Sequence, residues 1–483
     1  MKHYPVVIIG AGPAGLTAAY ELVKEGIAPV VLEKGDKVGG LARTETYKGY
    51  RFDIGGHRFY TKVAAVQQLW QEVLGNDFIK VPRLSRIYYR GRFFNYPISA
   101  VNTLLNLGII ESLLILLSYL KVRIFPLKEE TTFEQWVTNR FGERLYKTFF
   151  KTYTEKVWGI PCSEIQADWA AQRIKGLSLK TAIINALFGS NDTKTLIKEF
   201  DYPALGPGMM WEKFAEVVEE KSGKVYLDTK VISFQREGNK IQSITTEQNG
   251  ELVQFSADNF VTSMPISALV ERMEPAPPPE VLHAARSLKY RDFLIVSLIV
   301  DRPDLFPDNW IYIHSPEVQV GRIQNFKNWS AALVPDPKKS CLGMEYFCNE
   351  GGELWDMPDE ELVELATREL VKLGLVKTGD VEDGVVLRQR KAYPVYDSEY
   401  RGHLRVLEKF LKGIDNLQTI GRNGMHRYNN QDHSMLTGLL AARNILGENH
   451  DLWDVNTERS YYEDFTAERS KENSEASLIA QSS

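Results

Sequence analysis

Residues 10–15 read Gly-Ala-Gly-Pro-Ala-Gly and are the first in the chain whose spacing predicts chemistry. Gly10 permits a tight turn, Gly12 lets the backbone approach a pyrophosphate, and Gly15 lets a helix pack closely on a strand. The N-terminus of that helix attracts the negative charge of the pyrophosphate. The same glycines could serve only a tight turn, so the flanking elements decide between the two interpretations.

Elements of the right kind flank these glycines on both sides. Residues 6–9 form a short apolar run that predicts a buried strand, and a helical pattern follows over residues 16–23. A second predicted strand, residues 29–32, ends in Glu33, about 20 residues beyond the glycines, where a carboxylate can bind a ribose hydroxyl. The sequence therefore predicts a dinucleotide-binding site. Its expected members are Gly10, Gly12, Pro13, Ala14, Gly15, Glu33 and Lys34.

Two glycine pairs, at residues 39–40 and 55–56, follow this predicted site. Because glycine has no Cβ, such pairs let the backbone approach a large flat ligand, although ordinary turns would also use them. The pattern resembles the FAD enzymes of the amine oxidase and protoporphyrinogen oxidase superfamily. In that superfamily the first pair crosses the FAD diphosphate and the second lies beside the isoalloxazine ring. The resemblance implies FAD contacts at Gly40, Leu41, Ala42, Gly55, Gly56 and His57.

The C-terminal region of the chain fits the same resemblance. Residues 419–423 predict a last strand that ends in a glycine turn, and residues 434–445 predict a helix whose N-terminus could face the flavin. No Cys or His stands at a recognisable flavinylation motif, so we expect noncovalent FAD. Further cofactor contacts implied by the resemblance are Val231, Gly421, Arg422, Asp432 and Ser434.

Length, charge and cysteine content limit the class of protein. The chain has 483 residues and is expected to form two or three packed units. Its net charge of -5 argues against nucleic acid as a partner. The 3 cysteines follow no metal-ligand or disulfide spacing, which predicts no metal site and a reducing, cytoplasmic location. The first predicted strand begins so early that we expect no signal peptide. A homo-oligomer is compatible with the sequence.

Residues 101–125 are rich in Leu and Ile and are nearly long enough to span a bilayer. Asn102, Asn106, Glu111 and Ser118 interrupt the run, and a carboxylate in the middle of a span is costly in lipid. The favoured prediction is therefore a buried helix pair. The alternative is a monotopic membrane patch, because related oxidases of lipophilic substrates carry such a patch in their substrate domain.

The periodicity along the chain predicts an α/β fold in which a Rossmann-type FAD-binding domain contains an inserted helical domain and an antiparallel β-sheet substrate domain. Thr132 is a predicted cap of a helix in the insert, residues 167–184 predict another helix, and two-residue periodicity begins near Lys224. The expected order is a first FAD-binding segment (residues 1–95), a helical insert (96–205), a second FAD-binding segment with a β-meander (206–265), the sheet domain (266–405), a third FAD-binding segment (406–465) and a disordered tail (466–483).

Four segments narrow the superfamily, because they resemble UDP-galactopyranose mutases of the larger, eukaryotic kind in the same order. Residues 154–173 are similar to the helix-loop-helix of that family, and residues 91–97 are similar to its aromatic-Pro nucleotide loop. Residues 312–322 keep a tyrosine ten residues ahead of an arginine. The most specific segment is Asn430–Ser434, which reads Asn-Gln-Asp-His-Ser.

The resemblance implies a nucleotide-sugar pyranose-furanose mutase in which N5 of reduced flavin attacks the anomeric carbon and expels a nucleoside diphosphate. No net redox change occurs, and NAD(P)H could serve as external reductant. Two guanidiniums suit the leaving group, since each binds phosphate oxygens bidentately. The implied catalytic residues are His57, Arg173 and Arg322. The implied substrate contacts are Tyr96, Trp158, Arg173, Tyr312, Arg322, Tyr393, Tyr428 and Asn430.

Departures from the mutase pattern leave the sugar and the base open. Thr154 stands where those mutases show Asn, Trp329 where they show Tyr, and Ser99 where a Gln helps to read uracil. A 6-deoxy, amino or heptose nucleotide sugar, or another nucleoside, suits the sequence as well as UDP-galactose does. The alternative function is a FAD oxidoreductase resembling amine oxidases, desaturases or protoporphyrinogen oxidase. A flavin-binding scaffold without turnover is the third hypothesis.

Overall fold

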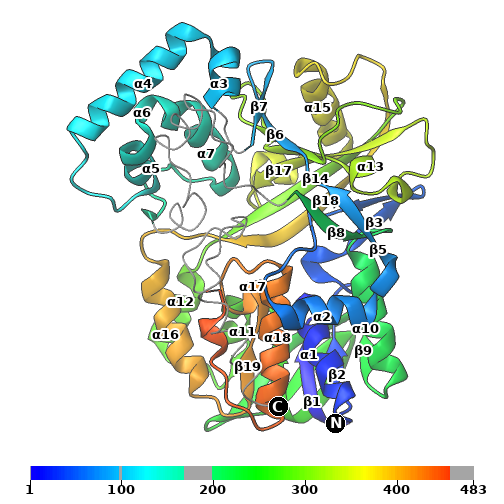
Figure 1. Cartoon of the computed structure of the whole chain (residues 1–483). Coiled ribbons are helices and arrows are strands. Elements are labelled where there is room, and N and C mark those ends of the chain that lie inside the picture. Colours follow the sequence, from blue (N-terminus) through cyan, green and yellow to red (C-terminus); the bar gives the residue numbers. More distant parts are fainter. Residues whose placement is uncertain (1, 97–99, 168–197, 457–483) are drawn as a thin grey trace.

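The computed structural model describes residues 2–96, 100–167 and 198–456. Two sheets dominate it, one in the lower and one in the upper half of Figure 1. A helical unit lies beside the upper sheet, at the upper left of the same view. This is the mixed α/β architecture that the sequence predicts.

The lower sheet contains the parallel core expected from the N-terminal pattern. Its order is β13-β10-β11-β12-β1-β2-β9, and β19 pairs in parallel with β12. Its strands are β1 (Lys2–Ile9), β2 (Val30–Leu32), β9 (Lys224–Tyr226), β10 (Thr229–Glu237), β11 (Lys240–Gln248), β12 (Glu251–Thr262), β13 (Met273–Glu274) and β19 (Leu417–Thr419). Residues brought together here come from both ends of the chain, so the cofactor-binding unit is assembled from separated segments.

Helices cover this sheet and supply most of its core. The sequence prediction of a helix after the first glycine motif is confirmed by α1. The flanking helices are α1 (Pro13–Lys24), α2 (Ala64–Val73), α10 (Gly208–Glu220), α11 (Ile266–Glu271), α12 (Pro279–Ser287), α16 (Tyr400–Lys412), α17 (Gly421–Gly424) and α18 (Gln431–Ile445). Their apolar residues share one buried cluster with Val6–Ile9 and Val30–Leu32. Such a continuous core fixes the loops at the carboxyl ends of the strands.

The upper sheet is antiparallel except for the parallel pair of β15 with β6, and its order is β18-β14-β17-β16-β15-β6-β7. Its strands are β6 (Ser85–Tyr89), β7 (Arg92–Asn95), β14 (Tyr290–Val300), β15 (Trp310–Ile313), β16 (Arg322–Asn325), β17 (Ser340–Cys348) and β18 (Val381–Pro394). The sequence grouped residues 85–95 with the cofactor-binding unit, but they pair with this sheet because β6 lies beside β15. The other domain boundaries stay predictions.

Smaller elements complete the upper half. Helices α13 (Phe326–Trp329), α14 (Glu353–Asp356) and α15 (Asp359–Lys372) accompany the sheet. Two antiparallel strand pairs, β3 (Thr44–Tyr47) with β4 (Tyr50–Asp53) and β5 (Phe78–Pro82) with β8 (Glu199–Pro203), lie between the units. The pair β5-β8 shows that the predicted helical insert ends in a strand.

The helical unit contains α3 (Ala100–Leu107), α4 (Ile109–Ile124), α5 (Phe133–Phe141), α6 (Glu143–Leu145) and α7 (Thr152–Trp158). Thr132 caps α5, because its Oγ1 accepts a hydrogen bond from the Gln135 backbone at 3.3 Å. The predicted helix at residues 167–184 and the predicted tail at 466–483 lie outside the described residues.

The prediction that residues 101–125 form a buried helix pair is wrong. They do form two helices, α3 and α4, but Ile109, Ile110 and Leu117 are 72%, 78% and 60% exposed. Only one stripe of α4, marked by Ile115 and Val122, packs against the unit. Among the described ranges of the chain, none of the helices is long and apolar enough to cross a membrane.

Candidate functional site

The first glycine motif forms a tight strand-to-helix turn at the carboxyl end of β1. Gly10 has φ of 100°, which favours glycine, and α1 begins at Pro13 with Gly12 as its N-cap. A Cβ at Gly15 would lie 1.9 Å from the carbonyl oxygen of Gly10, so Gly15 is needed for helix and strand to meet. The predicted roles of Gly10 and Gly15 in the turn and in the packing are confirmed.

The first glycine pair lies directly against this turn. The backbone N–H of Gly39 donates to the carbonyl of Ala11 at 2.8 Å, and a Cβ at Gly40 would lie 3.2 Å from Cα of Gly12. Leu41 and Ala42 continue in a short 3-10 turn. The backbone of Gly39 and Gly40 therefore lies against the positive N-terminus of α1. This arrangement fits a diphosphate.

Glu33 lies at the end of β2, next to the same turn. Its carboxylate accepts hydrogen bonds from the backbone N–H groups of Ala11 and Gly35, both at 2.9 Å. The backbone N–H of Thr229 donates to the carbonyl of Glu33 at 2.7 Å, which brings the start of β10, the strand that carries Val231, to this point. Lys34 follows with an exposed side chain. A carboxylate in this position fits the ribose of a dinucleotide.

The C-terminal helix α18 completes the cofactor side. Gly421 has φ of 76°, and a Cβ there would lie 3.1 Å from Cβ of Ala14. A Cβ at Gly438 would lie 2.1 Å from the carbonyl oxygen of Ala14. Helices α1 and α18 therefore pack so closely at this point that only glycine fits at residue 438. Gly10, Gly12, Gly40 and Gly421 thus form one glycine-lined cradle, and its residues fit FAD.

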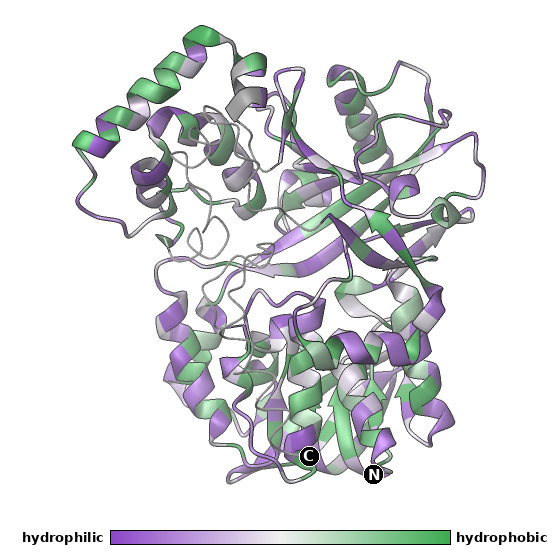
Figure 2. Cartoon of the chain, in the orientation of Figure 1, coloured by the Kyte–Doolittle hydropathy of each residue, from purple (hydrophilic) through white to green (hydrophobic). Residues whose placement is uncertain are grey.

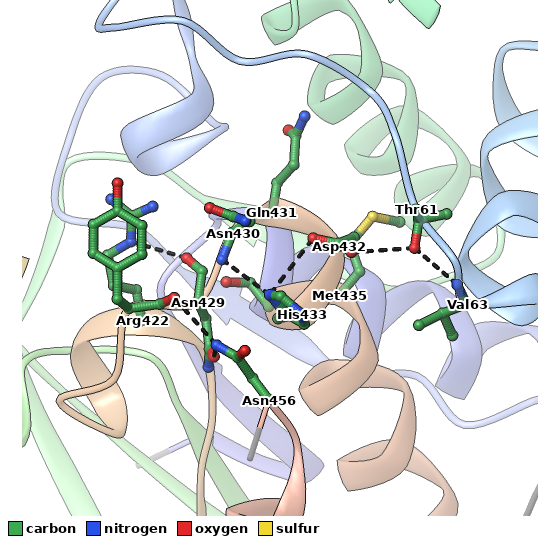
Figure 3. Close-up of polar contacts among 12 residues, drawn as sticks. Thr61, Val63, Arg422, Asn429, Asn430, Gln431, Asp432, His433, Met435 and Asn456 are labelled. Atoms are coloured by element: carbon green, nitrogen blue, oxygen red, sulfur yellow. Dashed lines mark hydrogen bonds and ion pairs between the residues drawn. The ribbon is translucent and has the colours of Figure 1, made fainter. Parts of the chain in front are cut away.

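The Asn430–Ser434 segment joins α18 to the loop that follows the second glycine pair (Figure 3). Thr61 donates through Oγ1 to Asp432 at 3.1 Å, and Gln431 donates through Nε2 to the Arg58 carbonyl at 3.0 Å. The backbone N–H of Asn430 donates to Nδ1 of His433 at 3.4 Å. Asp432 and Ser434 are 1% and 7% exposed, so this segment positions the loop; their predicted cofactor contacts stay predictions.

The second glycine pair lies against the upper sheet. Gly55 has φ of 90°, and a Cβ there would lie 3.7 Å from Nη2 of Arg322. A Cβ at Gly56 would lie 3.1 Å from the Trp329 ring, which is buried and donates through Nε1 to the Asn309 carbonyl at 3.0 Å. The loop that the resemblance places beside the flavin ring therefore lies next to Arg322 and Trp329.

Arginine side chains set the electrostatic character of this region. Burial, together with the positive charges of Arg422, Arg322 and Arg43, lowers the pKa of His57 to about 3. His57 is therefore neutral at ordinary pH. Arg43 is held by Glu45 at 2.6 Å and by the Gly40 carbonyl at 2.8 Å. A site surrounded by guanidiniums attracts an anionic ligand and disfavours a cationic one.

Arg322 is positioned by its neighbours in the upper sheet. It lies opposite Tyr312 of β15 and opposite Glu345 of β17. The Nε of Arg322 donates to the Glu345 carboxylate, and Gln324 donates through Nε2 to the same carboxylate at 2.7 Å. Glu345 is 0% exposed, so the ion pair is buried on one side. Both Nη groups of Arg322 have no bonded partner among the described residues and remain for a ligand.

Aromatic side chains form a wall next to Arg322. The rings of Tyr393 and Tyr428 stack at 5.7 Å, and the Arg422 guanidinium lies 4.7 Å from the centroid of Tyr428. Trp158 lies 6.4 Å from Tyr393, edge to face. On the other side Tyr96 lies 5.1 Å from Tyr312. The structure thus brings Tyr96, Trp158, Tyr312, Arg322, Tyr393, Arg422 and Tyr428 into one region.

Several site residues have no counterpart in the sequence prediction. Glu345 and Gln324 hold Arg322, and Tyr153 packs edge to face on Tyr312 at 5.5 Å. An acidic residue inside the apolar run of residues 340–348 was the available signal, since a buried carboxylate needs a partner. The partner itself depends on strand register. Arg173 and Ser99 lie outside the described residues.

Comparisons with known proteins agree with this geometry. A family model described as "Flavin containing amine oxidoreductase" matches residues 13–446. A solved structure of reduced UDP-galactopyranose mutase has a TM-score of 0.81 at 23% identity and covers 94% of this chain and 96% of that chain. This likeness shows a shared fold.

Two curated relatives carry different activities in their names. "Probable UDP-galactopyranose mutase" from Klebsiella pneumoniae is 27% identical over 183 residues, 35% of this chain and 44% of that protein. An L-amino-acid oxidase from Crotalus adamanteus is 24% identical over 312 residues, 59% of this chain and 56% of that protein. The chain therefore spans about half the length of the curated relatives it matches.

Proposed function

Because this chain belongs to the family of flavin-containing amine oxidoreductases, we propose that it uses that flavin fold as a nucleotide-sugar pyranose-furanose mutase. The ligand of the upper sheet is then a nucleoside diphosphate sugar. The sugar can be a 6-deoxy, amino or heptose sugar as well as galactose, because Thr154 and Trp329 depart from the mutase pattern.

The observation that carries the proposal is the place of Arg322. Its guanidinium is held through Nε by buried Glu345. The Nη side of the guanidinium lies beside Gly55. A diphosphate leaving group needs such a fixed, bidentate cation. A protonated amine, the substrate class of an amine oxidase, would be repelled by Arg322, Arg422 and Arg43 around His57.

The chain's own residues have separate tasks in this proposal. Gly12, Gly40 and the N-terminus of α1 bind the FAD diphosphate, and Glu33 binds the ribose. Bound FAD in its reduced form supplies a nucleophilic nitrogen for the anomeric carbon. Arg322 binds the substrate diphosphate and stabilises the negative charge that develops on it as the glycosidic bond breaks.

Other side chains orient the substrate or add positive charge at the diphosphate. Tyr312, Tyr393 and Tyr428 present hydroxyl groups to phosphate oxygens, and Trp158 packs beside the sugar. Neutral His57 can accept or donate one hydrogen bond near the flavin ring without adding positive charge. We assign Arg173 to the same diphosphate, as the mutase pattern implies.

The redox requirement tests the proposal most directly. The enzyme is expected to be inactive with oxidised FAD and active after reduction by dithionite or NAD(P)H, with many turnovers and no oxygen consumed. A panel of nucleotide sugars is incubated with reduced enzyme, and ring isomers are separated by anion-exchange chromatography. Acid precipitation should release all the FAD, since we propose noncovalent binding.

An oxidoreductase would behave in the opposite way. The similarity to an L-amino-acid oxidase makes this the second candidate. Substrate would then bleach the flavin, and each product formed would consume one oxygen and yield one hydrogen peroxide. That stoichiometry with any nucleotide sugar or amine, measured with an oxygen electrode, would replace the mutase proposal.

A further inference from the structure

The outer face of α4 is a continuous apolar surface. We define this face by Ile109, Ile110, Leu113, Leu114, Leu116, Leu117, Leu120 and Ile124, which are between 37% and 78% exposed. At about 100° per residue these positions share one side of the helix, roughly 160° wide. Figure 2 shows α4 as the outermost helix of its unit, with hydrophobic colour along most of its length.

The same apolar surface continues beyond both ends of α4. Leu105 of α3 is 71% exposed, and Phe125 and Leu127 after α4 are 74% and 44% exposed. Water-soluble monomers seldom expose so many contiguous large apolar side chains without a binding partner. Scattered apolar residues elsewhere on the surface, such as Leu252 at 69% exposed, need no such explanation.

Contacts on the opposite side of α4 fix which face points outward. Ile115 and Val122 are 7% exposed and pack into the helical unit. The Nε of Arg144 donates a hydrogen bond to the Glu111 carboxylate at 2.6 Å, and the backbone N–H of Arg144 donates to Ser118 Oγ at 3.1 Å. Rotating α4 to bury its outer face would break these contacts, so the exposure belongs to the fold.

Basic residues border the apolar face on both sides. Lys121 and Arg123 lie at the two edges of the face in the last turns of α4, and Lys128 follows; all three are exposed. Nearby acids are engaged within the unit, because Glu111 pairs with Arg144 and Glu143 pairs with Lys147. Glu129 is an exposed acid next to Lys128. The net charge of the border is still positive, because three basic residues outnumber this one acid.

The length and charge of α4 select one class of partner. Its 16 residues extend about 24 Å, which is short of the roughly 30 Å hydrocarbon core of a bilayer. A short helix with a wide apolar face and basic borders lies in the plane of a membrane surface. Its aliphatic side chains enter the acyl region, and its Lys and Arg side chains reach the headgroups.

We propose that α4, with Leu105, Phe125 and Leu127, is an in-plane membrane anchor that binds bilayers containing anionic lipid. The cationic border complements anionic headgroups. The anchor holds the helical unit, and with it the site beside Trp158 of the same unit, at a membrane surface. It extends beyond the proposed mutase function and does not depend on it.

Vesicle flotation tests the anchor on the full chain. Phosphatidylcholine vesicles, with and without an equimolar share of phosphatidylglycerol, are mixed with protein and centrifuged through a density gradient. We expect flotation with the anionic vesicles and about tenfold less with phosphatidylcholine alone or at high salt. Leu117→Glu should reduce flotation about tenfold, and K121E/R123E should abolish the preference for anionic lipid.

Leu252→Glu is the matched control, because it also places one carboxylate at an exposed leucine, 69% exposed on β12. This variant should float like the wild type, and circular dichroism should show that both variants fold. Absence of wild-type flotation would overturn the proposal. So would an oligomer that Leu117→Glu dissociates in sedimentation equilibrium while flotation is unaffected, because the outer face of α4 would then bind a second copy of the chain.

Discussion

Arg322 illustrates how a single functional side chain is held in place by residues that do not contact a ligand. Its Nε is bound to Glu345, which is 0% exposed, and Gln324 binds the other carboxylate oxygen at 2.7 Å. Breaking a buried ion pair from one side is costly, because it leaves an uncompensated charge. The pair therefore restricts Arg322 to one orientation and directs its Nη groups toward Gly55.

Replacement of Arg322 should separate its chemical role from its structural one. Arg322→Ala is expected to lower kcat/KM of the reduced enzyme by about 100- to 1,000-fold, because a charge contact in the transition state is lost. Flavin content should not change. Arg322→Lys should recover little activity, since an ammonium lacks the bidentate fork. Steady-state kinetics and the flavin absorbance of the purified variants provide the measurement.

Arg86→Ala is the control for that experiment. Arg86 of β6 also forms an ion pair with a fully buried acid, Asp308, which lies just before β15, at 2.6 Å. Both substitutions leave a buried carboxylate unpaired, so their thermal stabilities should fall by similar amounts. Only Arg322→Ala should lose activity; an equal loss in both variants would assign Arg322 a structural role alone.

Two glycines of the first motif have different tasks at the scale of the β1-α1 element. At Gly15 an added Cβ would meet the Gly10 carbonyl oxygen at 1.9 Å and the Ile8 side chain at 3.2 Å. At Gly12 an added Cβ would meet only the Gly40 Cα at 3.8 Å and the Gly39 carbonyl oxygen at 4.0 Å, which are ordinary contacts. Packing therefore demands glycine at residue 15, whereas the protein interior tolerates alanine at residue 12.

Gly12→Ala should consequently yield a folded protein that does not retain FAD, because its Cβ occupies the approach of the diphosphate. Gly15→Ala should instead fold poorly or melt well below the wild type, through the clash with Gly10. Flavin stoichiometry and the thermal midpoint of both variants are measured side by side. Stoichiometric FAD in folded Gly12→Ala would contradict the placement of the diphosphate.

At the scale of the whole molecule, three histidines from distant segments are neutral groups, and two of them, His314 and His426, are buried. Burial lowers the pKa of His57 and of His314 to about 3 and that of His426 to about 4. The pKa values of all three histidines lie well below their ordinary value of 6.5. At a pH between the folded-state and ordinary pKa values, the unfolded chain therefore binds more protons than the folded chain. Their contribution to stability is full above pH 6.5 and is lost as the pH falls toward 3.

Removing one of these histidines should make the protein more resistant to acid. His314→Gln is expected to shift the midpoint of acid unfolding to lower pH and to reduce proton uptake on unfolding by about one proton in the mildly acidic range. Tryptophan fluorescence and potentiometric titration give the two quantities. His283→Gln, at an exposed position, should leave both unchanged; an unchanged midpoint in His314→Gln would show that His314 is not a source of acid sensitivity.

Features that contiguous residues encode could be predicted without a structure. The glycine turn after β1, Glu33 at the end of β2 and the cap at Thr132 all depend on local backbone conformation, and the structure confirms each of them. The resemblance to the mutases also implied that Arg322, Tyr393 and Tyr428 share one site.

Which distant residues meet depends on the tertiary structure. Glu345 contacts Arg322 because the register of β16 and β17 places them opposite one another, and sequence periodicity does not determine strand register. The outer face of α4 was predicted to be buried, because its composition is that of a core helix. Its orientation follows from Arg144, Ile115 and Val122, which anchor the other side, and a hydrophobic pattern alone does not say which face finds a partner.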